Sequence, residues 1–301
     1  MNNHSSVNQL IETANTVLLG KESRIKLALA TLLANGHLLI NDIPGVGKTT
    51  LANLLARLFD LDFQRIQFTS DLLPADITGV SIFNPSSREF EFHPGPIFGQ
   101  LILADEINRA TPKTQSALLE AMEEKQVSVE RKTYPLPRPF FVVATQNPDE
   151  QAGTYTLPES QLDRFLVSMD IGYPDHRSER DMLQSESPRG RLDSVKPVMD
   201  GESLIQAQRE ARSVHCSDAL IDYAQALIEF TRSSEKFSSG YSPRAGMGLL
   251  ALARSWAYIH GRNTVIPEDL QAIVPATTHH LKPVAGKVDA FEDILKRVAI
   301  P

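Results

Sequence analysis

Apolar and polar positions follow two different periods along the first 174 residues. Apolar residues three and four positions apart predict helices, for example over residues 7–19 and 23–34. Short apolar runs between such segments predict buried strands. Five runs of this kind occur, at residues 38–40, 63–68, 101–104, 140–145 and 167–171. Strands that alternate with helices are typical of a three-layer α/β domain, in which helices cover both faces of a parallel sheet.

The pattern changes from Asp175 onward, where strand-like runs stop. Residues 175–192 are polar and include a Pro-Arg-Gly-Arg segment, which predicts a connector. Helical spacing then returns, with predicted helix starts at Ser217, Ser242-Pro243 and Pro267. We therefore expect an α/β core over residues 1–174, a linker over 175–192 and a small all-helical domain over 193–301.

Two insertions interrupt the predicted core. Residues 69–99 are rich in proline, glycine and serine, and residues 77–83 and 90–92 flank a turn-like segment, which predicts a hairpin. A second predicted hairpin, within residues 126–138, has the charged tip Glu130-Arg131-Lys132. Long insertions in compact domains are usually functional or disordered, and a decorative surface loop is the alternative for the first one.

Composition narrows the class of protein. The chain has 301 residues, 42% of them hydrophobic, and a formal net charge of -7, which argues against a broad nucleic-acid-binding surface but leaves a local basic channel possible. The single Cys216 excludes an internal disulfide, and His279-His280 lacks a third ligand at metal spacing. No secretory signal and no transmembrane run are visible, so a cytoplasmic protein is expected.

A glycine-rich loop follows the first predicted strand, between Asn41 and the helix that begins near Thr50. Glycines at 45 and 47 let successive backbone N–H groups point inward, and the next helix adds the positive end of its dipole. Such a loop binds polyphosphates, with Lys48 on the outer phosphates and the Thr49 hydroxyl on Mg²⁺. Asp42 departs from the consensus, which begins with glycine. The loop residues expected to hold the nucleotide are Pro44, Gly45, Val46, Gly47, Lys48, Thr49 and Thr50.

Acidic and polar residues end two later strands. Asp105 can hold Mg²⁺ through water, and Glu106 can polarise an attacking water. Asn147, after the strand at 140–145, can orient a water near the terminal phosphate, or it is an ordinary turn asparagine. Arg244, in the first turn of a helix of the second domain, could reach across the cleft, whereas Arg164 alone reads as an ordinary surface arginine.

Together these motifs resemble the AAA+ ATPases. More narrowly, four segments resemble the MoxR family. They are Phe92 to Phe98 (FHPGPIF), Leu103 to Ala110 (LADEINRA), Ala117 to Glu124 (ALLEAMEE) and Gly153-Thr154-Tyr155. The likeness covers nearly the whole chain. It implies an AAA+ P-loop NTPase domain with a helix-two insert at 71–96, a pre-sensor-one hairpin at 126–138 and a helical lid.

The resemblance also implies roles for individual residues. Lys48 and Thr49 match the Walker A positions, and Asp105 and Glu106 match the Walker B magnesium and catalytic positions. Asn147 matches sensor one, Arg244 sensor two, and Arg164 the arginine finger that acts on nucleotide in the neighbouring subunit. Leu19 and Gly20 match the segment near the adenine. The implied cofactors are ATP and Mg²⁺.

The family resemblance further implies a homo-oligomeric ring, often a hexamer, that acts like a chaperone. Its expected work is to remodel, assemble or help metallate partner proteins, frequently ones with von Willebrand factor A domains. Two alternatives stay open. One is a nucleic-acid-associated AAA+ motor, suggested by the basic hairpin tip, and the other is a slow, nucleotide-gated assembly scaffold.

Overall fold

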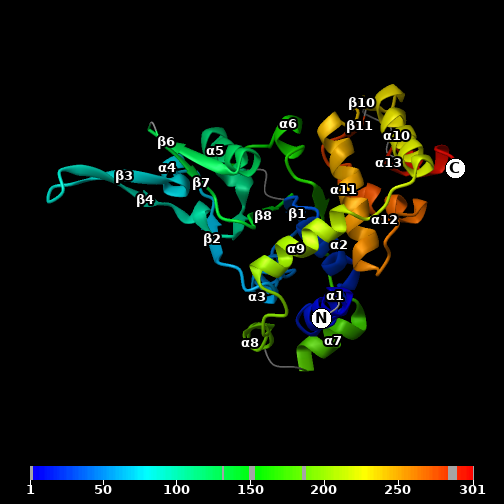
Figure 1. Ribbon diagram of the computed structural model, residues 1–301, viewed down its shortest axis with the longest axis horizontal. Helices are drawn as coiled ribbons and strands as arrows, with labels where there is room; N and C mark the ends of the chain where they lie inside the picture. The colour runs from blue at the N-terminus through cyan, green and yellow to red at the C-terminus, as the bar shows by residue number, and fades with distance from the viewer. Residues whose placement is uncertain (1–2, 131, 149–152, 185–187, 284–289, 301) are drawn as a thin grey trace.

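The core of the protein is a five-stranded parallel sheet in the order β2-β5-β8-β1-β9. The computed structural model describes residues 3–130, 132–148, 153–184, 188–283 and 290–300 (Figure 1). Within it the sheet strands are β1 (Leu38–Asn41), β2 (Phe63–Gln67), β5 (Leu101–Asp105), β8 (Phe141–Gln146) and β9 (Val167–Met169). Leu38 of β1 pairs in register with Val143 of β8 on one side and Val167 of β9 on the other. The five strands expected from the apolar runs are thus present, and all of them are parallel.

Helices cover both faces of this sheet because side chains alternate along each buried strand. Leu38 and Ile40 point into one hydrophobic cluster and Leu39 into the other. The first cluster lies under α1 (Asn3–Val17), α2 (Glu22–Leu33) and α3 (Lys48–Leu58), and the second under α5 (Pro112–Glu124). The three-layer α/β architecture is confirmed.

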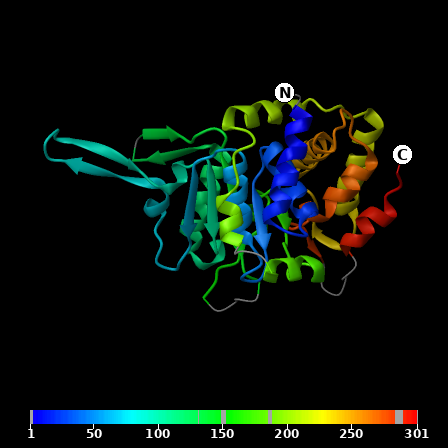
Figure 2. The same cartoon turned by 90° about the horizontal axis from the view of Figure 1, so that it is seen from below.

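A long hairpin, β3 (Gly79–Asn84) with β4 (Glu89–Pro94), projects from one end of the molecule (Figures 1 and 2). A shorter hairpin, β6 (Gln126–Val129) with β7 (Lys132–Pro135), lies beside it, and the rings of Phe92 and Tyr134 stack with centroids 4.0 Å apart. Residues 77 and 78, expected in the first strand, instead end the short helix α4 (Pro74–Thr78), which starts at a proline. Arg131 of the charged tip lies outside the described residues.

Short elements complete the core. They are η1 (Pro96–Phe98), η2 (Ile107–Arg109) and α6 (Glu159–Leu162). Beneath the sheet, the ring of His37 accepts a hydrogen bond from the Val142 backbone N–H at 3.0 Å, and its other nitrogen faces the Met122 carbonyl at 3.4 Å. Burial lowers the pKa of His37 to about 3, so the ring is neutral and ties the start of β1 to β8 and to the end of α5.

The expected connector at 175–192 contains two helices that the sequence pattern did not indicate, α7 (His176–Gln184) and α8 (Pro188–Asp193). The Asp175 carboxylate starts α7 by accepting a hydrogen bond from the Ser178 backbone N–H at 2.8 Å. Arg57 of α3 pairs with Asp193 at the end of α8 at 2.7 Å. Both helices have few apolar residues, and for that reason hydrophobic periodicity does not reveal them.

The second domain is helical, as expected, with one small addition. Its helices are α9 (Gly201–Arg212), α10 (Asp218–Ser233), α11 (Pro243–Ile259), α12 (Pro267–Thr277) and α13 (Ala290–Arg297). The addition is an antiparallel pair of very short strands, β10 (Phe237–Ser239) and β11 (Lys282–Pro283). Ser217 and Ser242 cap α10 and α11 through their hydroxyls. One continuous apolar cluster joins these helices to α1–α3, and the division at 174 and 192 stays a prediction.

Candidate functional site

A cavity of about 320 Å³ opens at the carboxyl ends of β1, β5 and β8. Three separate segments of the chain build it: the glycine-rich loop, the acidic end of β5 and the residue after β8. Its lining residues are Pro44, Gly45, Gly47, Lys48, Thr49, Thr50, Asp105, Glu106 and Asn147. Ligands of α/β sheets bind at this edge. The structure therefore brings together the predicted loop residues other than Val46 with the predicted metal and water-binding residues Asp105, Glu106 and Asn147.

The loop itself has the backbone that a phosphate cradle needs. Gly45 and Gly47 have φ of +87° and +102°, a left-handed conformation in which a side chain would be strained. α3 begins directly after, at Lys48, so its N-terminal N–H groups point toward the cavity. The Lys48 ammonium donates to the carbonyl oxygen of Asp42 at 2.5 Å. Val46 does not line the cavity and packs instead against the apolar core.

Asp42 has a structural role at the position where the consensus has glycine. Its carboxylate accepts hydrogen bonds from three backbone N–H groups: Ile43 at 2.8 Å, Ile171 at 2.7 Å and Gly172 at 2.7 Å. The side chain is only 7% exposed. Asp42 thus ties the start of the phosphate loop to the chain that leaves β9, which fixes the loop before any ligand binds.

Replacing Asp42 with alanine should destabilise the protein by about 2–4 kcal/mol. A buried N–H donor left without an acceptor costs about 1–3 kcal/mol, and of the three hydrogen bonds that of Ile171 is buried while those of Ile43 and Gly172 are partly buried and cost less. Urea unfolding measures this change. Asp193→Ala, which removes only the exposed ion pair with Arg57, is the control and should unfold almost like the wild type. A midpoint for Asp42→Ala equal to that of the control would contradict the role assigned to this carboxylate.

The acidic end of β5 is held by residues of its two neighbouring strands. Thr145 of β8 donates its hydroxyl to Asp105 at 2.6 Å and accepts the Glu106 backbone N–H at 2.9 Å. Arg65 of β2 pairs with the other oxygen of Asp105 at 2.5 Å. Glu106 has φ of +57°, an unusual conformation for a residue with a side chain, and such strain is concentrated at functional sites.

The carboxylate of Glu106 has two partners. Gln67, the last residue of β2, donates its amide to Glu106 at 2.8 Å, and Arg109 lies at 3.4 Å. Sequence reasoning missed Arg65, Gln67 and Thr145. The alternation of β2 puts Arg65 and Gln67 on one face, but only the pairing of Gln67 with Asp105 in register shows which neighbour they meet.

Thr49 and Asp105 fit a magnesium ion. Mg²⁺ prefers hard oxygen ligands and commonly takes one or two from protein, with the rest from water and phosphate. A threonine hydroxyl and a carboxylate line the same cavity here, beside Lys48. The donor set therefore suits the metal that accompanies a nucleotide triphosphate.

Arg164 and Arg244 lie elsewhere. They line a second cavity of about 210 Å³, which shares no residue with the first, and both pair with Glu123 at the end of α5. His37, just before β1, lines this cavity, whereas the phosphate loop follows β1. The two cavities are thus at opposite ends of the strands. The contact of Arg244 with the phosphate site of its own chain, which was expected across the cleft, is not made in this structure.

The segment predicted to lie near adenine is beside the phosphate loop but does not line the cavity. A Cβ added to Gly47 would lie 3.3 Å from the Leu18 side chain, and one added to Gly20 would lie 2.4 Å from the Ser178 hydroxyl. Leu19 and Gly20 therefore occupy the corner between α1, the phosphate loop and α7.

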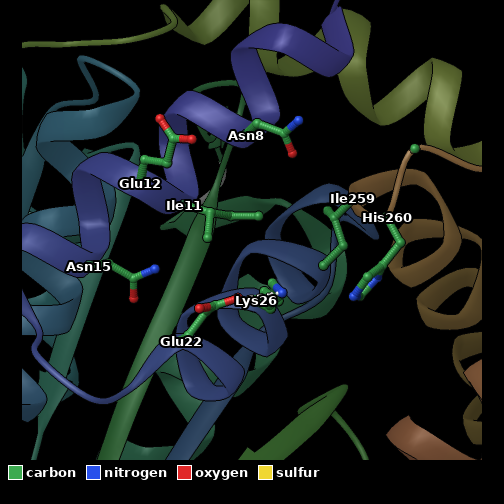
Figure 3. Close-up of a pocket in the computed structure, with 9 residues that line it drawn as sticks. Asn8, Ile11, Glu12, Asn15, Glu22, Lys26, Ile259 and His260 are labelled. Carbon is green, nitrogen blue, oxygen red and sulfur yellow. Dashed lines mark ion pairs between the residues drawn. The ribbon is translucent and has the colours of Figure 1, made fainter.

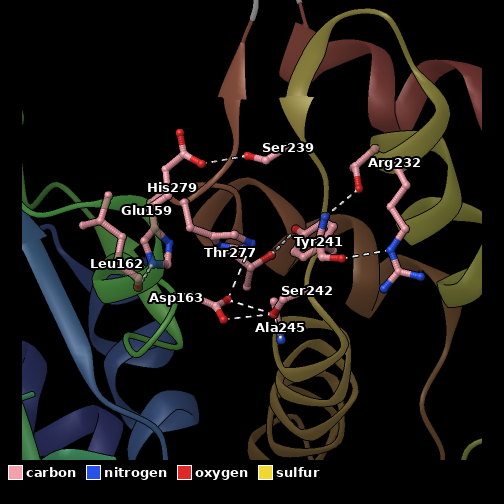
Figure 4. A network of polar contacts seen from close by, with 12 residues as sticks. Glu159, Leu162, Asp163, Arg232, Ser239, Tyr241, Ser242, Ala245, Thr277 and His279 are labelled. Carbon is pink, nitrogen blue, oxygen red and sulfur yellow. Dashed lines mark hydrogen bonds and ion pairs between the residues drawn. The ribbon is translucent and has the colours of Figure 1, made fainter. Parts of the chain in front are cut away.

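The two domains meet in a polar network at α6 (Figure 4). The Ser242 hydroxyl donates to the Asp163 carboxylate at 2.9 Å, and a ring nitrogen of His279 lies 3.0 Å from the Leu162 carbonyl. Burial lowers the pKa of His279 and of His280 to about 4, so both rings are neutral at pH 7. No group of three or more potential metal-binding side chains occurs among the residues that the structure describes.

A further cavity, of about 400 Å³, lies between α1, α2 and the end of α11 (Figure 3). Glu22 and Lys26 within it form an ion pair at 2.6 Å, and His260 lies on the far side. Its charged lining residues are Glu12, Glu22 and Lys26, so it offers less positive charge to a phosphate than the loop with Lys48 does. Across the described ranges, no helix combines the length and apolar character needed to cross a membrane.

Comparison with known proteins also indicates a nucleotide-binding protein. A family model described as the ATPase family associated with various cellular activities (AAA) matches residues 37–167, and one for the AAA lid domain matches residues 229–296. The uncharacterized protein YeaC of Bacillus subtilis is 47% identical over 92% of this chain and 87% of its own length. Chaperone MoxR1 of Mycobacterium tuberculosis is 39% identical over 88% of this chain and 72% of its own.

Similarity extends to a more distant relative and to a solved structure. Protein MoxR of Paracoccus denitrificans is 30% identical over 89% of this chain and 86% of its own length. The crystal structure of a candidate ATPase from Cytophaga hutchinsonii is 36% identical, covers 99% of this chain and 96% of that chain, and superimposes with a TM-score of 0.90.

Proposed function

Because this chain belongs to the MoxR family of AAA+ ATPases, we propose that it hydrolyses ATP with Mg²⁺ at sites shared between neighbouring subunits of a ring. The site residues form two sets, and these lie at opposite ends of the strands of one sheet. This separation is the observation that carries the proposal. The residues at the carboxyl ends of the strands can bind the triphosphate and activate water, and those at the opposite ends include Arg164 and Arg244.

The phosphate edge has the groups that bind and activate. Lys48 and the loop N–H groups would hold the β- and γ-phosphates, and Thr49 and Asp105 would hold Mg²⁺, which neutralises charge on the phosphate oxygens. Glu106 would take a proton from the attacking water while Asn147 orients it. As charge spreads over the transferred phosphoryl group, a further cation lowers the barrier, and neither Arg164 nor Arg244 of the same chain lines this cavity.

The opposite edge is strongly cationic. Next to the cavity with Arg164 and Arg244 lies one of about 760 Å³ that shares Lys125 with it. Its charged lining residues, as far as the chain is described, are all basic: Lys125, Arg138, Arg209, Arg212 and Arg254. Burial lowers the pKa of Lys125, and the nearby positive charge of Arg138 lowers it further. An edge of this kind complements the triphosphate on the neighbouring subunit, which supports a head-to-tail ring such as a hexamer.

We further propose that the energy of hydrolysis acts on protein clients. One relative of this chain is named a chaperone, and the β3–β4 hairpin carries large apolar side chains that a folded protein normally buries. Phe83 of β3 is 50% exposed and Phe90 of β4 is 62% exposed. The hairpin that they belong to projects from one end of the molecule (Figure 2). Exposed apolar patches of this kind mark interaction sites. Remodelling, assembly or metallation of proteins with von Willebrand factor A domains fits this arrangement.

A nucleic-acid-dependent motor is the second candidate, because the basic cavity at the arginine edge could also take a phosphate backbone. Two facts argue against this candidate. Among its described lining residues, the basic cavity has no exposed aromatic side chain on which a base could stack, and the whole chain has a net negative charge. Stimulation of ATP hydrolysis by duplex DNA would favour this candidate over a protein client.

The test is the dependence of ATP hydrolysis on protein concentration, with the oligomeric state followed by size-exclusion chromatography and light scattering. If sites are shared, activity per chain should rise with concentration as the ring forms, because an isolated chain lacks the neighbour's arginines. A monomer that hydrolyses ATP at constant activity per chain would overturn the proposal.

A further inference from the structure

Glu123 bridges the two arginines that come from different domains. Its Oε2 lies 3.1 Å from an Nη atom of Arg164, which follows α6 of the core, and its Oε1 lies 2.9 Å from an Nη atom of Arg244, in the first turn of α11. One carboxylate thus contacts both guanidinium groups, one oxygen to each.

The position of Glu123 is not explained by its helix. It lies in the last turn of α5, which ends at Glu124, and a carboxylate there faces the negative end of the helix dipole. The chain around it is anchored by His37, whose ring faces the Met122 carbonyl at 3.4 Å. The two arginines that it contacts compensate this carboxylate for its unfavourable position in the helix.

A second bridge joins the same two segments. Asp163, adjacent to Arg164, accepts a hydrogen bond from the Ser242 hydroxyl, which lies 3.1 and 2.9 Å from its two carboxylate oxygens. Ser242 also caps α11, which begins at Pro243, one residue before Arg244 (Figure 4). The two arginines are therefore attached to each other at two points, through Asp163–Ser242 and through Glu123. Their relative position is set by this pair of contacts rather than by either domain alone.

The chemistry of the bridge suits two cations that act together. Two guanidinium groups repel each other, and a carboxylate between them removes the repulsion and restricts their side-chain rotamers. Each guanidinium has five N–H donors in a planar fork and uses only one nitrogen on Glu123. The other donors can therefore bind phosphate oxygens while the bridge stays in place.

We propose that Glu123 is a positioning residue that holds Arg164 and Arg244 as one unit for the nucleotide of the neighbouring subunit. The inference rests on the proposed shared site. The inference predicts that Glu123 acts in the subunit that donates the arginines and not in the subunit that holds the ATP. A residue needed only for folding would matter equally in both.

The experiment mixes two inactive chains. A Glu106→Gln chain cannot hydrolyse its own ATP but donates arginines, and an Arg164→Ala chain has an intact phosphate site but no finger. Mixed rings should recover activity at the sites of the Arg164→Ala chain. Glu123→Ala is then added to one chain at a time, with Glu124→Ala, the adjacent exposed carboxylate, as the matched control.

In the donor chain, Glu123→Ala should lower the recovered rate about tenfold or more, because the arginines lose their common anchor. In the acceptor chain the same change should alter the rate by less than about twofold, and Glu124→Ala should do little in either chain. Glu123→Gln in the donor, which keeps the shape and one acceptor oxygen, should lie between wild type and alanine. Fluorescent-nucleotide affinity should stay unchanged throughout.

Two other outcomes separate the inference from its premise. If the two chains recover no activity when mixed, although light scattering shows mixed rings, the shared-site proposal fails. If they recover activity and Glu123→Ala has the same effect in donor and acceptor, or no effect in the donor, the shared site stands and the positioning role of Glu123 is overturned.

Discussion

Replacing Glu106 with glutamine should lower kcat by about 10³-fold and leave ATP affinity within about threefold of wild type. General-base catalysis by a positioned carboxylate contributes about 10²–10⁴ in rate, and an amide cannot accept the proton. Binding should survive because Lys48 and the loop glycines, not Glu106, form the phosphate cradle. Steady-state phosphate release and the binding of a fluorescent ATP analogue measure the two quantities.

The control for this substitution is Glu120→Gln, which makes the same chemical change on the exposed face of α5 and should leave both quantities unaltered. Turnover near the wild-type rate in Glu106→Gln would show that another group activates the water. Loss of nucleotide binding would instead assign Glu106 to the phosphate cradle.

Replacing Arg164 with alanine should lower the ATPase rate by about 10³-fold or more, the typical contribution of an arginine that stabilises the transferred phosphoryl group. Rings should still form, and nucleotide affinity should change little, because Arg164 lies on Glu123 at the opposite edge of the sheet from the nucleotide cavity of its own chain. Phosphate release, light scattering and nucleotide binding report on the three properties.

Mixing supplies the decisive comparison. Lys48→Ala chains cannot bind the triphosphate well but keep their arginines, so adding them to Arg164→Ala chains should restore part of the activity. Arg57→Ala, which removes an exposed arginine of α3 paired with Asp193, is the control and should stay near wild type. An Arg164→Ala protein that retains most of its activity would remove this residue from the mechanism.

Local patterns were sufficient for much of the fold and of the phosphate site. The buried strands are continuous apolar runs, and the phosphate loop combines glycines, lysine and threonine at fixed spacing. Each strand and the loop can therefore be recognised from about ten consecutive residues. Because parallel strands place their carboxyl ends at one edge, Lys48, Asp105 and Asn147 were expected to converge, and they line one cavity.

Other features depend on which strands and helices become neighbours. Gln67 reaches Glu106 only because β2 pairs with β5, and two of the three N–H donors to Asp42 reach it only because β9 ends beside β1. Helices α7 and α8 have few apolar residues and so escaped detection, and α8 is held in place by contacts with α1 and α3. These contacts join residues far apart in the chain, and local propensity has no information about them.

The sequence by itself determined the chemistry of the phosphate edge: a loop that binds polyphosphate, a carboxylate for a metal and another for water. Only the tertiary structure decided where the arginines lie. Arg164 and Arg244 are 80 positions apart, and their meeting on Glu123 depends on how the helical domain packs against α2 and α5. The packing of two domains follows from the shape of their joined apolar core, which no single segment encodes, and it placed both arginines away from their own nucleotide cavity.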